Sequence, residues 1–288
     1  MSNVVTWEEF KGLIGGLTAH NNSLLYRGQA NDTWKLQTSF HRAAAVNGIT
    51  MQQYVEIMIP EIHYYICANH NHIIDLSNPM EYGAFLALIQ HHGFPTPLLD
   101  WTLSPYIAAY FAFREVNDTF PASEYVKMYI FDYLGWMKSF KQTLDLRDYD
   151  NPHVSVIRPY AKFNPRIIQQ QGQFTISNID DIENHLYQMS VYVKKDFLYT
   201  ALLSVKEKPL VLRELNLMGI NHMSLFPSID GICEALKNQF FSAASVGPTL
   251  NEILQLRMQN FSVPEEAIAA PKRKKRRRRK KGNPSQAS

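Results

Sequence analysis

The sequence predicts an α+β fold in which helices flank a mixed, mostly antiparallel sheet. Strand-like and helix-like segments alternate without the regular rhythm of a parallel α/β protein. Hydrophobic residues make up 45% of the 288 positions, which is ordinary for a globular protein with a substantial core. We find no internal repeat. We therefore expect one globular domain over residues 1–262, followed by a disordered basic tail over 263–288.

The first expected elements are marked by caps and glycines. Thr6 and Glu9 have the spacing of a capping box and begin a helix at TWEEFKGLI. SLLYRGQ predicts a short strand that ends at Gly28. Two helical stretches follow, residues 49–68 with Pro60 as a kink or boundary, and residues 80–93 with Gly93 as the stop signal.

The segment 91–113, HHGFPTPLLDWTLSPYIAAYFAF, has the strongest local signals. PLLDW predicts a short buried strand, after which Ser104 is the expected N-cap and Pro105 the first residue of a buried helix. Asp100 lies between these apolar stretches. Its carboxylate could cap the following helix, or it could line a cleft at a strand-to-helix junction.

The second half of the chain predicts further strands and helices. Strands are expected in 124–136, after Gly172, in 190–198 and at HMSLFP (222–227); helices are expected around PRIIQQQ (165–171), over 207–219 with Gly219 as its stop, and at DGICEALKNQFF (230–241).

Charge divides the chain into an acidic body and a basic tail. Without the ten cations of KRKKRRRRKK, 19 Lys and Arg remain against 26 Asp and Glu, which leaves −7. Such a run on a segment with little to bury predicts sequence-independent binding of nucleic acid or another polyanion, or else a solvated or localisation-type tail. The cations are Lys272, Arg273, Lys274, Lys275, Arg276, Arg277, Arg278, Arg279, Lys280 and Lys281.

Several function classes are disfavoured by the sequence. Dinucleotide-binding, Walker A, G-x-S-x-G and H-E-x-x-H patterns are absent. The histidine pairs 91–92 and 70/72 lack further ligands at metal spacing, so we predict no metal. Only two cysteines, and no secretory signal or apolar run of membrane-spanning length, favour a cytoplasmic protein without membrane contact.

Besides the segment of Asp100, two further strings carry polar candidates. Arg27 follows an apolar strand and precedes a glycine, so it could hold an anion or form an ordinary strand-end salt bridge. The glutamines 169–171 could present amides to a nucleotide or simply form a polar turn.

Taken together, these strings resemble the FRG domain, a family named for a Phe/Tyr-Arg-Gly motif. Here the motif is Tyr26-Arg27-Gly28, and the longer match is Gln90-His91-His92-Gly93-Phe94-Pro95-Thr96, then LLDWT (98–102) and Ser104-Pro105. Arg166 with QQGQF (170–174), and SLFP (224–227) with Asp230-Gly231, resemble later blocks of the family. The resemblance covers about residues 5–245.

The family's pattern is distantly similar to ADP-ribosyltransferase folds, which implies NAD as substrate and a protein as acceptor. Carried over to this sequence, Arg27 with Tyr26 would hold the NAD phosphates or ribose. Thr102 and Ser104 would lie on the second element, and Tyr106 or Tyr110 would lie near the nicotinamide. Gln171 would occupy the third block. That block has no Glu, so Asp100 would have to supply the catalytic carboxylate. The resemblance implies a transferase, such as a toxin with an antitoxin partner or an antiphage effector. The alternative is a non-catalytic module that binds a nucleotide or nucleic acid.

Overall fold

The computed structural model describes residues 3–20, 23–70, 72–117, 119–160, 166–241, 251–252 and 254–255. The chain divides into two units, Met1–Val246 and Gly247–Ser288, and the fold below is that of the first unit. The predicted disorder of 263–288 and the cations of 272–281 lie outside the described residues.

The described strands form one mixed, mostly antiparallel sheet, in the order β1-β7-β4-β2-β3-β6-β5. β1 runs parallel to β7, whereas the other neighbouring pairs are antiparallel. The strands are β1 (Asn3–Val4), β2 (Leu24–Gln29), β3 (Leu98–Thr102), β4 (Tyr125–Asp132), β5 (Val154–Ile157), β6 (Gly172–Ser177) and β7 (Leu198–Ser204). This arrangement confirms the α+β prediction.

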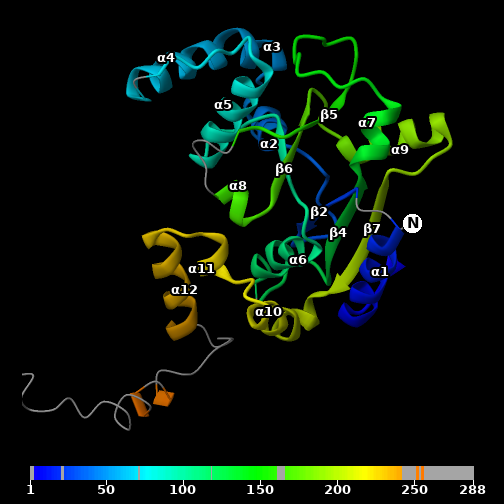
Figure 1. The fold of residues 1–288 in the computed structure, drawn as a ribbon, viewed down its shortest axis with the longest axis vertical. Coiled ribbons are helices and arrows are strands. Elements are labelled where there is room, and N and C mark those ends of the chain that lie inside the picture. Colours follow the sequence, from blue (N-terminus) through cyan, green and yellow to red (C-terminus); the bar gives the residue numbers. More distant parts are fainter. Residues whose placement is uncertain are drawn as a thin grey trace, which may run out of the picture. The chain divides into compact units, whose positions relative to one another are not determined.

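Helices cover both faces of this sheet (Figure 1). They are α1 (Trp7–His20), α2 (Ser39–Asn47), α3 (Met51–Gln53), the π-helical turn η1 (Tyr54–Met58), α4 (Ile59–His70), α5 (Pro79–His91), α6 (Pro105–Arg114), α7 (Tyr133–Ser139), α8 (Arg166–Gln169), α9 (Ile182–Val193), the 3₁₀ turn η2 (Val205–Glu207), α10 (Lys208–Leu217), α11 (His222–Leu225) and α12 (Ile229–Phe241). Among the described residues, every helix is too short or too polar to cross a membrane.

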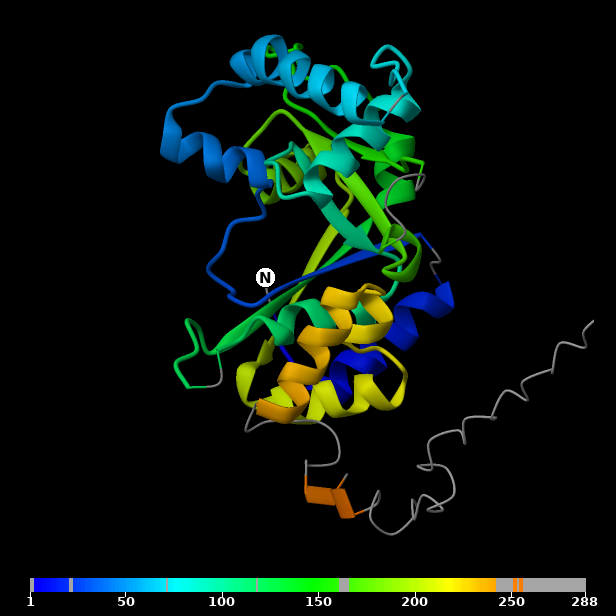
Figure 2. The same cartoon turned by 90° about the vertical axis from the view of Figure 1, so that its left-hand side faces the viewer.

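Three apolar clusters form the core. One packs α1, α6 and α10 on β2, β4 and β7. A second packs α2, η1 and α5 on β3 and β6. A third, on the opposite face of the sheet, packs α7 and α9 on β2, β3 and β4. Both ribbon views show α2–α5 at one end of the sheet and α1, α6 and α10 at the other (Figures 1 and 2).

The sheet is nearly split in its middle, and this split positions the site. All six residues of β2 pair with β4, and all five residues of β3 pair with β6. β2 and β3, in contrast, pair at one position, where Tyr26 lies opposite Thr102. Leu98 and Thr102 are four residues apart on β3 and therefore lie on the same face of the sheet as Tyr26, which pairs with Thr102. Tyr26 belongs to the first cluster and Leu98 to the second, so these two clusters share this face and meet at the split.

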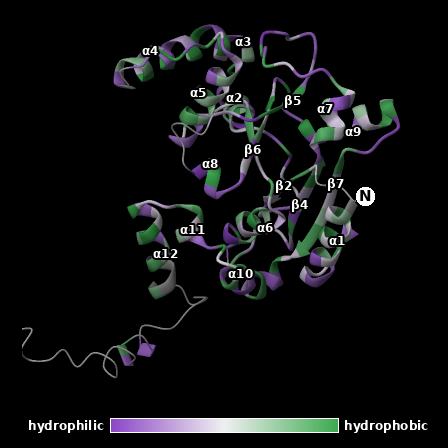
Figure 3. Ribbon diagram, viewed as in Figure 1, coloured by the Kyte–Doolittle hydropathy of each residue, from purple (hydrophilic) through white to green (hydrophobic). Residues whose placement is uncertain are grey.

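Local signals placed most elements correctly. Thr6 and Glu9 exchange the hydrogen bonds of a capping box, and Gly219 follows α10 with φ of 78°. Pro60 lies in the first turn of α4, directly after the π-helical turn, so the boundary interpretation is confirmed. The segment between α7 and β5 is mostly hydrophilic and forms a loop (Figure 3).

Two predicted strands are wrong, and the strand predicted over 124–136 is too long, because residues 133–136 belong to helix α7. Residues 190–193 end helix α9, and the strand begins only at Leu198. HMSLFP forms the helical turn α11, which Asn221 and Ser224 cap reciprocally.

Candidate functional site

A pocket of about 730 Å³ opens at the split between β2 and β3. Its floor comes from these two strands and from the start of β6, and its walls come from α5, α6, α8 and Phe226. This volume lies in the usual range for small-molecule sites. The pocket therefore lies where the two apolar clusters on one face leave a gap.

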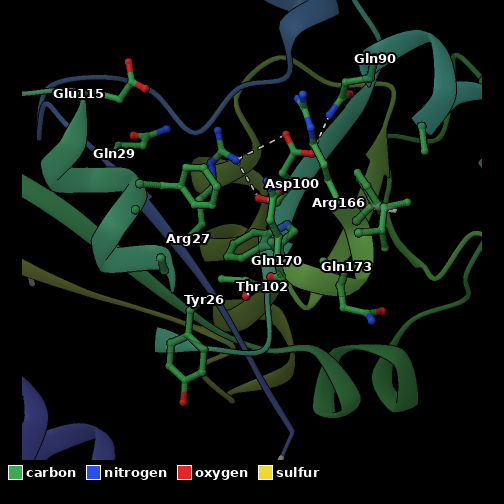
Figure 4. A pocket seen from close by; sticks show the side chains of 18 of the residues that line it. Tyr26, Arg27, Gln29, Gln90, Asp100, Thr102, Glu115, Arg166, Gln170 and Gln173 are labelled. Atoms are coloured by element: carbon green, nitrogen blue, oxygen red, sulfur yellow. Dashed lines mark hydrogen bonds and ion pairs between the residues drawn. The ribbon is translucent and has the colours of Figure 1, made fainter. Parts of the chain in front are cut away.

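Arg27 and Asp100 face each other across the split (Figure 4). The Nη1 group of Arg27 donates a hydrogen bond of 2.7 Å to the backbone oxygen of Asp100, and lies 4.0 Å from its carboxylate oxygen Oδ2. At Asp100 the backbone of β2 no longer pairs with β3, so the guanidinium of Arg27 supplies the hydrogen-bond donor for the backbone oxygen of Asp100. Its Nε–H is buried without a hydrogen-bond partner among the described residues. An unpartnered charged donor favours an incoming acceptor.

A chain of side chains on the α5 side fixes Asp100. Gln90, near the end of α5, donates from Nε2 to Oδ1 of Asp100 over 2.7 Å. Thr96, which is fully buried, donates its hydroxyl hydrogen to Oε1 of Gln90. Thr96 Oγ1 also accepts from the backbone N–H of Leu98 at 3.3 Å, so it is tied to the strand that carries Asp100.

Burial and charge act in opposite directions on this pair. The side chain of Asp100 is 61% exposed because it opens into the pocket, yet the surrounding protein removes much of the water from its carboxylate. Desolvation raises the pKa of Asp100, while Arg27 and the hydrogen bond from Gln90 oppose that rise. Desolvation likewise lowers the pKa of Arg27, and the guanidinium stays charged at physiological pH.

The remaining charges of the lining favour an anion. Arg42 of α2 and Arg166 of α8 join Arg27, against the carboxylates of Asp100 and Glu115. Glu115 is held by Arg114, whose Nε lies 3.0 Å from its carboxylate. Three guanidinium groups against two carboxylates leave a net charge of +1 on the lining, and guanidinium forks match phosphate oxygens.

Aromatic side chains supply flat surfaces around the pocket. Trp34 lines it and is 52% exposed, so much of its indole is open to a ligand. Phe226 packs edge to face against Phe111, with their ring centres 6.0 Å apart, and carries Arg166 over its ring at 5.2 Å. Phe226 is also stacked on His222, with ring centres 4.5 Å apart, so Trp34 supplies the exposed aromatic face. An exposed indole beside guanidinium groups suits a planar ring attached to phosphates.

Other predicted residues hold the walls together. Gly28 lies directly under α6, where a Cβ would come within 2.1 Å of the backbone oxygen of Ala108. Thr102 donates to the backbone oxygen of Gln170 at 2.7 Å and accepts from the N–H of Ser104 at 3.1 Å. Ser104 caps α6 by accepting from the N–H of Ile107. Asp100 therefore does not cap this helix.

The structure separates some predicted site residues from the pocket. Gln171, at φ of 48°, is exposed and outside the lining, whereas Gln170 belongs to it. Tyr26 contributes to the lining, but its ring points away from Arg27 into the core (Figure 4). Tyr110 is 8% exposed and pairs with His222 at 3.2 Å, and Tyr106 packs edge to face on Trp7. Neither tyrosine of α6 lines the pocket.

Residues 22–119 match the family model of the FRG domain. These residues make up about a third of the chain, and over them the chain is similar to the FRG domain. Searches of curated proteins and of solved structures found no match. The matched segment contains Arg27, Gln90 and Asp100. Arg166, Gln170 and Phe226 line the same pocket from beyond that segment.

Sequence reasoning assigned no role to several lining residues. Gln90 of the lining and Thr96, which contacts it, lie in the FRG-like stretch 90–96, where their polar side chains were a usable signal. Arg42, Trp34 and Glu115 carried no local signal, because only the tertiary fold brings them to the pocket.

Proposed function

We propose that the pocket binds a nucleotide with a pyrophosphate group, and that the FRG-domain chain acts on NAD as an ADP-ribosyltransferase-like enzyme. The observation that carries the proposal is the convergence of three guanidinium groups and a fixed carboxylate in one pocket with aromatic walls. Arg27 is the most important of them, because no residue in the described part of the chain accepts a hydrogen bond from its buried Nε–H.

The chemistry assigned to the site is cleavage of the bond between nicotinamide and ribose. The arginines hold the phosphate oxygens, which fixes the ribose against Asp100. Nicotinamide leaves with the bonding electron pair, and the carboxylate stabilises the positive charge that develops on the ribose. A nucleophile of the acceptor then bonds to the ribose carbon, and its proton passes to Asp100 or to water.

A non-catalytic nucleotide-binding module is the second candidate. The position of Gln171 outside the pocket favours it, as does the amide of Gln170, which donates to the backbone oxygen of Leu225 at 3.1 Å. In the segment that would carry the third catalytic group, the side chain of Gln170 is thus already engaged.

Ligand binding tests the shared part of both candidates. Calorimetry and thermal unfolding with NAD, ADP-ribose and ATP would compare the wild type with Arg27→Ala, Arg27→Lys and the exposed control Arg213→Ala. At a ligand concentration of about 100 times Kd, the wild type gains about 2.7 kcal/mol, equivalent to roughly 5–10 °C in Tm. Arg27→Lys should lose this gain as fully as Arg27→Ala, since lysine lacks the planar fork.

Labelled NAD in cell lysate separates the two candidates. Transfer of label that requires Arg27 and Asp100 supports the enzyme. Nucleotide binding without transfer or release of nicotinamide supports the module. If no nucleotide shifts the Tm of the wild type, or if Arg27→Lys responds like the wild type, the ligand assignment is wrong.

A further inference from the structure

Gln90 has a more specific place in this site than that of a lining residue. Its side chain amide is engaged at both ends, because Oε1 accepts from Thr96 and Nε2 donates to Oδ1 of Asp100 at 2.7 Å. An amide whose oxygen already accepts a hydroxyl hydrogen can present only its N–H groups to the carboxylate. The buried hydroxyl of Thr96 therefore decides which end of Gln90 faces Asp100.

This orientation makes the two oxygens of Asp100 unequal. Oδ1 accepts from Gln90, while Oδ2 lies on the side of Arg27, 4.0 Å from Nη1 and beyond hydrogen-bond distance. A carboxylate otherwise free to rotate is thus held in one orientation, with one oxygen left for the ligand.

We propose that Gln90, oriented by Thr96, is a positioning residue that holds Asp100 by one carboxylate oxygen and leaves the other for the bound ligand. This proposal rests on the proposed function only in assuming that the pocket binds a nucleotide. The hold on the carboxylate exists in the free protein and can be measured there.

The charged groups around Asp100 come from several elements. Arg27 on β2 and Arg42 on α2 both lower its pKa, in the same direction as the hydrogen bond from Gln90. His91 on α5, Arg166 on α8 and Glu115 after α6 line the same pocket. Removing the Gln90 donor leaves those charges in place, so its effect on Asp100 is separable from theirs.

The test is a carboxyl-carbon NMR titration of protein labelled in its aspartates, with the Asp100 signal assigned by its loss in Asp100→Asn. Gln90→Leu should raise the Asp100 pKa by about one to two units, the equivalent of a charge-assisted hydrogen bond. Thr96→Val should raise it in the same direction but by less, because the amide loses the hydroxyl that holds its Nε2 against the carboxylate. Thr96→Ser keeps the hydroxyl and should restore the wild-type titration.

The same variants are then titrated with NAD between pH 5 and 8. Gln90→Leu and Thr96→Val should shift the pH dependence of binding upward with the Asp100 pKa, while thermal unfolding shows that the variants are folded. An Asp100 titration that is unchanged in folded Gln90→Leu overturns the proposal. If nucleotides fail to bind any variant but the NMR shift is found, Gln90 still positions Asp100 and only the proposed ligand is wrong.

Discussion

His41 is a buried histidine whose surroundings suit only its neutral form. It is 9% exposed, and its Nδ1 lies 2.7 Å from the hydroxyl oxygen of Thr38, the N-cap of the same helix. Burial lowers its pKa from 6.5 to about 4. The unfolded chain therefore binds a proton at a higher pH than the folded chain does.

This difference predicts a loss of stability in acid. As the pH falls from about 6.5 to about 4, the unfolded state gains a proton that the folded state does not accept, at a total cost of about 3 kcal/mol. Urea unfolding at pH 7.5 and pH 4.5 should show a decline about 2–3 kcal/mol larger in the wild type than in His41→Gln. The exposed His92→Gln should behave like the wild type. Equal declines in the wild type and His41→Gln would contradict this assignment.

For single residues, the residue type predicted the place in the fold better than it predicted the hydrogen-bond partners. Ser104 was identifiable as an N-cap because a serine before Pro at a helix start accepts a hydrogen bond from a backbone N–H of the first turn. In the structure its Oγ accepts from the N–H of Ile107. For Asp100 the sequence left a cap and a site open. The choice depends on Gln90 and Arg27, 10 and 73 residues away, and no local pattern reports such contacts.

The packing of α6 on β2 is the element-scale feature that the FRG motif encodes most directly. The backbone of Gly28 touches α6 so closely that an added Cβ would lie 2.1 Å from the oxygen of Ala108 and 2.7 Å from the Cβ of Ala112. Backbone cannot move aside as a flexible side chain can. Gly28 is therefore required by the contact between α6 and β2, whereas the side chain of Arg27 lines the pocket.

Gly28→Ala should accordingly separate α6 from the sheet. Forcing a methyl group into this contact is an overpacking change, and we expect a loss of about 3 kcal/mol in unfolding free energy. Gly12→Ala in α1 is the matched control, since its Cβ would meet nothing within 4 Å, and it should gain up to about 1 kcal/mol. Chemical denaturation of both variants measures the difference. A Gly28→Ala variant as stable as the wild type would show that the contact is looser than described.

The two wrong strands show why β-propensity misleads at this scale. SVYV of 190–193 is rich in strand formers, but Ile182, Leu186 and Ser190 recur at helical spacing and are buried on one face. Lys194, at φ of 54°, ends that helix before the strand begins. In HMSLFP, the reciprocal caps of Asn221 and Ser224 fix a helical turn in a segment too short for periodicity to decide.

At the scale of the whole molecule, the sequence predicted the α+β class but not the split that makes the site. The order of elements and their apolar patterns follow from local residues. The divergence of β2 from β3 follows from which helices cover each half of the sheet, and that depends on contacts between distant segments. For the same reason the pocket draws residues from 26 to 226, although the family match ends at 119.

The basic tail gives the last prediction, which concerns the charge of the whole chain. Residues 272–281 are ten consecutive cations attached to a remainder of −7, so a polyanion should be attracted by the tail and repelled by the rest. If six to ten phosphates are engaged, affinity for random DNA or RNA should fall by roughly 10³–10⁵ between about 50 and 200 mM salt. Gel shifts would compare the full chain with a version truncated after Ala270 and with one whose ten cations are replaced by glutamine. Both changed versions should lose the binding and its salt dependence, while their response to NAD stays that of the full chain. Binding that survives truncation with the same salt slope would place the polyanion site elsewhere in the molecule.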